Sequence, residues 1–266
     1  DVEIDNLRKA GVHFQTDTII GKTISVKELE EKGFKGIFVG SGAGLPNFMD
    51  IPGENLINIM SSNEYLTRVN LMDAANPKTD TPVILGKKVI VVGGGNTAMD
   101  SCRTAKRLGA DVTLVYRRSE AEMPARLEEV KHAKEEGVNF LTLHNPKEYL
   151  ADEDGRVKAA VLDVMKLGEP DASGRRRPES TGETVTMECD QVIVAVGVSP
   201  NPLVPNSIEG LELGRKNTIA VNEQMQSSRS DIYAGGDIVR GGATVILAMG
   251  DGRRAATNMA EQLLKG

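Results

Sequence analysis

The chain has 266 residues and a formal net charge of −6, with 28 glycines, no tryptophan and only two cysteines. This length suits about two domains, and the acidic balance excludes a general nucleic-acid binder. Two distant cysteines cannot form a four-thiolate iron–sulfur site. No apolar run approaches the length that spans a bilayer. We therefore expect a cytoplasmic protein with neither nucleic acid nor membrane as a partner.

The first 82 residues are expected to alternate short helices and strands. Ser25 and Glu28 have the spacing of a capping box, which predicts a helix to Lys32. A buried strand is predicted over 36–40, where apolar residues lie between two glycines. The remaining expected elements are a helix over 2–10, a strand pair over 12–20, a helix over 61–75 and a proline-containing linker over 76–82.

A glycine turn follows the apolar run that ends at Val92, and a helical pattern begins at Asn96. This order of strand, glycine turn and helix is typical of a dinucleotide-binding βαβ unit. Glycine without a Cβ permits the tight turn and lets the backbone approach a pyrophosphate, and the helix N-terminus favours its charge. The expected contacts are Gly93, Gly94, Gly95, Asn96 and Thr97, with Ala98 in the third glycine position.

The second strand of this unit, over 112–116, ends in Arg117 and Arg118. A site for NAD usually has an acid here to hold the ribose hydroxyls, whereas a guanidinium can grip a 2′-phosphate with two hydrogen bonds. The pattern therefore predicts NADPH as the ligand. The alternative is a glycine turn in an unrelated α/β protein.

The next elements are a charged helix over about 119–136 and four strands near 138–143, 157–164, 184–188 and 190–196. The polar stretch 168–182 is expected to be a hairpin excursion, with Arg175, Arg176 and Arg177 at a solvated tip. Prolines over 199–202 mark a second crossing between domains.

A second signal lies near the end, where a short apolar strand ends in Gly236 and Asp237 and a helix follows to about Leu264. Here the chain resembles the pyridine-nucleotide flavoprotein oxidoreductases. That resemblance implies that Asp237 binds the ribityl or phosphate part of FAD. It also implies that the N–H groups of Ala243, Thr244 and Val245 face the flavin pyrimidine. The alternative is an aspartate that only caps a turn before a surface helix.

The flanking motifs extend the resemblance to the glutamate synthase small (beta) subunit family over essentially the whole chain. They are the runs 36–56, 93–100, 116–118 with Met123 and Pro124, and 235–239 through Arg254, with Gly197 in the family's glycine motif at the exit of the NADP domain. The resemblance implies that NADPH reduces FAD and that electrons pass through iron–sulfur clusters. The implied acceptor is the glutamate synthase large subunit or another partner.

Two family features are not found: an upstream iron–sulfur domain, and an FAD-binding Gly-x-Gly-x-x-Gly. The run 40–44 is spaced Gly-x-Gly-x-Gly with Pro46 close behind, and we do not interpret it as that turn. The expected architecture is an α/β, two-dinucleotide-binding flavoprotein fold. A Rossmann-like NADP domain with an antiparallel meander (83–198) would be inserted in a partial FAD-binding domain (1–82 and 199–266), as in the C-terminal portion of a longer protein.

The sequence thus predicts an NADPH-dependent flavin oxidoreductase without side-chain acid–base catalysis, because the cofactors carry the chemistry. No catalytic residue and no metal ligand is predicted, since His13, His132 and His144 have no metal spacing. Two alternatives stay open. The chain could be an NADP-binding module without turnover, or a relative that reduces another acceptor such as ferredoxin.

Overall fold

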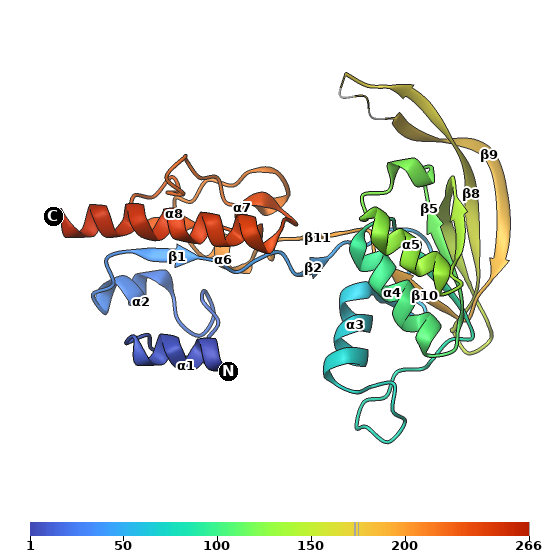
Figure 1. The fold of residues 1–266 in the computed structure, drawn as a ribbon, viewed down its shortest axis with the longest axis horizontal. Helices are drawn as coiled ribbons and strands as arrows, with labels where there is room; N and C mark the ends of the chain where they lie inside the picture. Colours follow the sequence, from blue (N-terminus) through green and yellow to red (C-terminus); the bar gives the residue numbers. More distant parts are fainter. Residues whose placement is uncertain (173, 175, 266) are drawn as a thin grey trace. The chain divides into compact units, whose positions relative to one another are not determined.

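The structure is a computed structural model that describes residues 1–172, 174 and 176–265. The chain divides into two compact units (Figure 1). The central unit is Pro46–Val198, and the terminal unit combines Asp1–Leu45 with Ser199–Gly266. The chain passes from one unit to the other at β2 (Leu45–Pro46) and β11 (Val198–Ser199).

The central unit is built on a five-stranded parallel sheet with strand order β3-β10-β4-β5-β6. Its central strands are continuous apolar runs, as parallel strands buried on both faces require. The strands are β3 (Ile59–Ser61), β4 (Lys88–Val92), β5 (Asp111–Tyr116), β6 (Asn139–Thr142) and β10 (Gln191–Val194).

Each face of this sheet has its own hydrophobic core. Val89 and Val91 of β4 pack with helices on one face, whereas Ile90 and Val92 pack with antiparallel strands on the other. Successive strand residues point to opposite faces, so one strand contributes to both cores. The helices are α3 (Ser62–Leu71), α4 (Asn96–Arg107) and α5 (Leu127–Glu135), with a short 3-10 turn η1 (Glu120–Glu122) before α5 (Figure 1).

An antiparallel meander, β7-β8-β9, covers the second face. Its strands are β7 (His144–Ala151), β8 (Val157–Pro170) and β9 (Arg176–Glu188). The hairpin expected over 168–182 is confirmed as the distal end of β8 and β9, where Leu167 pairs with Pro178 and Pro170 with Arg176. Arg176 and Arg177 are exposed on β9, and Arg175 lies outside the described residues.

The terminal unit contains two parallel strands, β1 (Ile37–Val39) and β12 (Ile232–Ala234), in register from Ile37 with Ile232. Both strands contribute to a small core with Val26, Ile208 and Ile238. The helices of this unit are α1 (Val2–Lys9), α2 (Val26–Glu31), α6 (Leu203–Asn206), α7 (Asp237–Arg240) and α8 (Val245–Leu264), with the 3-10 turn η2 (Arg215–Asn217).

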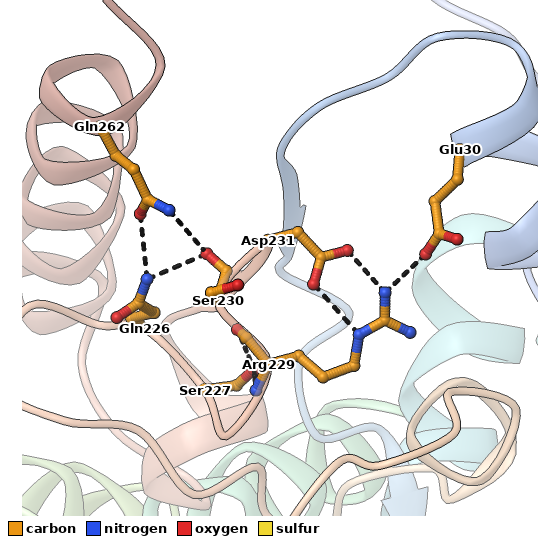
Figure 2. A network of polar contacts seen from close by, with 7 residues as sticks. All are labelled: Glu30, Gln226, Ser227, Arg229, Ser230, Asp231 and Gln262. Atoms are coloured by element: carbon orange, nitrogen blue, oxygen red, sulfur yellow. Dashed lines mark hydrogen bonds and ion pairs between the residues drawn. The ribbon is translucent and has the colours of Figure 1, made fainter. Parts of the chain in front are cut away.

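A polar network secures the segment before β12 (Figure 2). Arg229 binds both carboxylate oxygens of Asp231, at 3.1 and 2.6 Å, and donates to Glu30 of α2 at 2.6 Å. From α8, Gln262 donates to the carbonyl of Ser230 at 3.3 Å and accepts from Gln226 at 3.0 Å. The network thus joins α2 and α8 to the entry of the strand that leads to Gly236.

Three expectations differ from the structure. The strand pair over 12–20 is wrong: the described strands begin at Ile37, and Ile20 forms only an isolated bridge with Ile24. The helix over 119–136 divides into η1 and α5, because Pro124 lacks an N–H and restricts the residue before it. The units divide at residue 45 rather than 82, because β3 joins the parallel sheet and Tyr65 of α3 joins its helix-side core.

Candidate nucleotide-binding site

The predicted glycine turn lies at the carboxyl edge of the parallel sheet. Gly93 follows β4, Arg117 follows β5, and Ala195 follows β10. Chain order runs outward from β4 through β5 to β6, whereas β10 and β3 lie on the other side of β4. The boundary between β4 and β10 is therefore a topological switch point, the place where open α/β sheets bind ligands.

The three glycines of the turn differ in what a side chain would meet. At Gly93 the φ of +141° is unfavourable for other residues, and a Cβ would lie 2.3 Å from the carbonyl oxygen of Ala195. A Cβ on Gly94 would lie 2.6 Å from the Tyr116 ring. A Cβ on Gly95 would meet no atom within 4 Å among the described residues, apart from its neighbours in the chain. Gly93 and Gly94 are thus required by packing, and Gly95 leaves open space.

The first residues of α4 divide between surface and core. Asn96 and Thr97 are exposed, whereas Ala98 is fully buried with Val91 of β4, where a small side chain keeps helix and strand close. The Asn96 Oδ1 accepts a hydrogen bond from the Arg126 N–H at 2.9 Å. The amide of Asn96 is therefore partly used within the protein, and it holds the start of α5 against the glycine turn.

The arginine pair lies at the same edge, after β5. Arg117 is exposed, and Arg118 is half-buried with its carbonyl accepting from the Leu143 N–H at 3.0 Å. Within the described residues neither guanidinium forms an ion pair, and the buried Arg118 Nε has no hydrogen-bond partner. These two cations are consequently available to an anion.

Gly197 closes the site on the β10 side. Its φ is +102°, and its carbonyl accepts from the Asn47 N–H at 3.0 Å. The structure thus brings the expected NADP residues of three different strands to one edge of one sheet.

The terminal unit has a cavity of about 320 Å³ at the carboxyl ends of β1 and β12. Its lining includes Phe38, Gly40, Gly42, Gly236, Asp237 and Thr244. Several glycines in the lining leave backbone accessible to a ligand. The volume is at the lower end of the range for small-molecule sites, so it suits part of a dinucleotide rather than the whole.

The predicted flavin residues have partners within the protein as well. The Asp237 Oδ1 accepts from the Ala243 N–H at 3.0 Å, which is the capping role that the alternative interpretation expected. Ala243 therefore does not have a free donor for a flavin. Thr244 caps α8 by accepting from the Leu247 N–H at 3.4 Å, and Val245 begins this 20-residue helix.

One buried acid supports this cavity. Asp251 of α8 has only 1% of its surface exposed, and it accepts from the Gly236 N–H at 3.1 Å. Arg240 also donates to both of its oxygens, at 2.6 and 2.7 Å. This guanidinium holds the pKa of Asp251 below its usual range, against the opposing effect of burial. The Asp251–Arg240 pair fixes the backbone at Gly236.

The sequence analysis missed four of these residues. Gly40 and Gly42 belong to the run that was not interpreted as a flavin turn, yet they line the cavity beside Gly236. Their signal was the glycine pair directly after a buried strand. Asp251 and Arg240 gave no signal, because a helical acid and a nearby arginine are typical of a solvated surface.

We also searched the described residues for a metal site, a membrane-spanning helix and a reactive thiol. They contain no group of three or more metal-ligating side chains, and no helix long and apolar enough to cross a membrane. Burial raises the pKa of the Cys102 thiol and raises that of Cys189 to about 12. Both are free and buried thiols, which remain protonated and unreactive near neutral pH.

The sequence is similar to that of a known protein family and to several of its members. The sequence profile of the family described as pyridine nucleotide-disulphide oxidoreductase matches residues 2–252. The chain is 37% identical over 99% of its length to the NADP(+)-dependent formate dehydrogenase subunit beta of Moorella thermoacetica. It is 35% identical over 95% of its length to the glutamate synthase [NADPH] small chain of Halomonas elongata. It spans 36% and 55% of those two relatives, respectively.

The fold agrees with a solved structure. Mycobacterium tuberculosis FprA in complex with NADPH matches with a TM-score of 0.75 and 19% identity, over 94% of this chain and 68% of that one. The chain belongs to the pyridine nucleotide-disulphide oxidoreductase family. The predicted α/β two-dinucleotide-binding fold and the resemblance to the glutamate synthase small subunit are confirmed. Proteins of this family bind NADPH and FAD.

Proposed function

We propose that this member of the pyridine nucleotide-disulphide oxidoreductase family binds NADPH on its central unit and takes a hydride from it. The observation behind the proposal is the convergence of the glycine turn, the arginine pair and Gly197 at the switch point between β4 and β10. The names of the two relatives, one NADP(+)-dependent and the other given with NADPH, support the choice of nucleotide.

Each part of this edge has a physical role toward NADPH. The open space at Gly95 and the N–H groups at the start of α4 receive the pyrophosphate, where the helix dipole favours negative charge. Arg117 and Arg118 bind the 2′-phosphate through charge-assisted hydrogen bonds. Gly197 gives the nicotinamide half an approach to the backbone after β10.

The cavity of the terminal unit fits part of FAD. Gly40, Gly42 and Gly236 leave room for close approach, Asp237 offers its second carboxylate oxygen, and the start of α8 offers N–H groups and a positive dipole end. FAD, when bound, supplies two-electron acceptance from NADPH and onward electron transfer. The protein's own contribution is to bind and orient both nucleotides, with no side-chain acid or base required.

Electrons then leave for a partner. The relatives are named as subunits of a formate dehydrogenase and a glutamate synthase, which supports a separate redox subunit or domain as the acceptor. The chain spans only part of these relatives, so the partner is proposed by class: an iron–sulfur or flavin protein, with the glutamate synthase large subunit as one candidate and ferredoxin as another.

The test replaces Arg117 and Arg118 with alanine together and measures NADPH and NADH affinity by calorimetry. Two lost charge-assisted bonds at about 1.5 kcal/mol each predict roughly 100-fold weaker NADPH binding, with NADH within about twofold. The matched control replaces Arg176 and Arg177, an exposed pair on β9 of the same unit. Unchanged NADPH affinity, or equal weakening of both nucleotides, would refute the assignment.

Turnover is tested separately from binding. Purified protein is mixed with FAD and then NADPH under anaerobic conditions, and the visible spectrum is recorded. Retained flavin absorbance that NADPH bleaches supports the oxidoreductase. A colourless protein that still binds NADPH supports a binding module without turnover.

A further inference from the structure

The arginine pair lies on a short segment, and the residues on both sides of the pair donate hydrogen bonds to Glu122. Tyr116 precedes the arginines and Ser119 follows them. The Glu122 carboxylate accepts from the Ser119 N–H at 3.0 Å and from the Ser119 hydroxyl at 2.8 Å, forming a capping box around η1. The Glu122 carbonyl accepts from the Tyr116 hydroxyl at 2.9 Å. Both flanks of the arginine pair are therefore bonded to Glu122.

The closed segment is also fixed to the glycine turn. The Tyr116 ring packs against Gly94, and the Ala125 N–H donates to the Gly94 carbonyl at 3.1 Å. The next residue, Arg126, donates its N–H to Asn96 at the start of α4. Residues 116–126 thus form one structure with residues 94–96, and the distance between the arginines and the turn is set before any ligand binds.

Both acids of this segment already have partners within the protein. Glu120 forms an ion pair with Lys134 of α5 at 2.5 Å, and the Glu122 carboxylate is used by Ser119. In the part of the chain that the structure describes, neither acid forms an ion pair with Arg117 or Arg118. The two acids lie close in sequence to the arginine pair without neutralising it.

We propose that Glu122 is a positioning residue that sets NADPH selectivity by preorganising Arg117 and Arg118. This inference rests on the proposed function of the arginine pair. Binding an anion orders both the arginine side chain and the backbone that carries it, and a backbone that is already fixed removes the second of these entropic costs. The Glu122 carboxylate is bonded to Ser119, directly after the arginines. The contacts with residues 94–96 come from other groups, the Ala125 and Arg126 N–H groups and the Tyr116 ring. Loss of this carboxylate should therefore weaken the 2′-phosphate contacts more than the parts that NADPH shares with NADH.

The test compares Glu122→Ala with Glu122→Gln in the full chain, using calorimetric affinity for NADPH and NADH. We expect Glu122→Ala to weaken NADPH binding about 5- to 20-fold and NADH binding less than twofold. Glu122→Gln retains an acceptor oxygen for Ser119, so its NADPH affinity should stay within about twofold of the wild type. The matched control is Glu120→Ala, which removes an acid of the same turn that is bonded to Lys134; its NADPH affinity should also stay within about twofold.

Three outcomes would overturn the inference: unchanged NADPH affinity in Glu122→Ala, equal weakening of both nucleotides, or the same loss in Glu122→Gln. If Glu122→Ala does not fold, Tyr116→Phe is the substitute, because it removes one of the three hydrogen bonds that Glu122 accepts. It should lower the ratio of NADPH affinity to NADH affinity. Its thermal midpoint is measured as well, to show that the variant is folded. The arginine double variant separates the two claims. If it loses NADPH selectivity while the Glu122 and Tyr116 variants keep it, the arginine assignment stands and the positioning role fails.

Discussion

Replacing Gly95 with alanine should separate the requirements of folding from those of the ligand. The backbone there is extended, with φ −92° and ψ 177°, which alanine adopts without strain. Apart from the chain neighbours of Gly95, no atom that the structure describes lies within 4 Å of the added Cβ. Alanine restricts the unfolded chain, worth about 0.4–1 kcal/mol, but it is a poorer N-cap than glycine by about 0.5–1 kcal/mol. The net change in the free energy of unfolding is therefore expected within about 1 kcal/mol.

Nucleotide binding should respond differently. The added methyl group projects into the space where we place the pyrophosphate, so we expect NADPH and NADH affinity to fall together by at least about tenfold, or 1.4 kcal/mol. Gly93→Ala is the contrasting variant, because its Cβ would meet a backbone oxygen at 2.3 Å and its φ is +141°. It should lose about 3 kcal/mol or more of folding free energy.

The assays are urea unfolding for stability and calorimetry for affinity, on the wild type and both variants. A Gly95→Ala protein that folds normally and binds NADPH as tightly as the wild type would show that the pyrophosphate does not approach this residue. A Gly95→Ala protein that fails to fold would show that the apparent space is needed by the protein itself.

Two further predictions concern stability. Asp251→Asn should lower the free energy of unfolding at pH 7 by about 2–3 kcal/mol, because it leaves Arg240 without its charged partner. The pKa of Asp251 is lowered in the folded protein, so its ionised carboxylate contributes to the free energy of unfolding above about pH 4. That contribution is lost as the pH falls further, and Asp251→Asn should therefore lose less stability in acid than the wild type. The same pH dependence in both proteins would contradict this. Ser101→Ala should raise the free energy of unfolding by about 1 kcal/mol, because the buried Ser101 hydroxyl has no hydrogen-bond partner among the described residues. Urea unfolding of this variant checks the sign, and a loss of stability would indicate a partner for the hydroxyl.

Local patterns in the sequence predicted local structure well. The capping box of Ser25 and Glu28 is present, with reciprocal bonds of 3.1 and 2.8 Å. The strand, glycine turn and helix around Gly93 are also confirmed, because an apolar run and a helical period specify both elements without reference to the rest of the chain. These features depend on residues at most a few positions apart.

Structure that depends on distant partners was not predictable in the same way. The strand β7 was missed because it includes Asn145 and Pro146, which disfavour strands, and its pairing with β8 decides its conformation. The expected strands over 12–20 have suitable apolar residues, but among the described residues their only β-pairing is the isolated bridge between Ile20 and Ile24. Gly40 and Gly236 are far apart in sequence, and only the parallel pairing of β1 and β12 brings them to one cavity.

The acids near the arginine pair have a role that only the hydrogen-bond geometry of the structure defines. Between Arg117 and Arg126 the sequence contains two acids, Glu120 and Glu122, which suggests local neutralisation of the cations. In the structure, Glu120 forms an ion pair with Lys134, and the Glu122 carboxylate accepts a hydrogen bond from the Ser119 hydroxyl. The segment therefore keeps its positive charge where a phosphate is proposed to bind, and it uses one of its negative charges to hold that positive charge in place. If the Glu122 carboxylate opposed the phosphate, both Glu122→Ala and Glu122→Gln would bind NADPH more tightly than the wild type. Because the carboxylate is bonded to Ser119, we expect instead that Glu122→Ala binds NADPH more weakly and that Glu122→Gln stays close to the wild type.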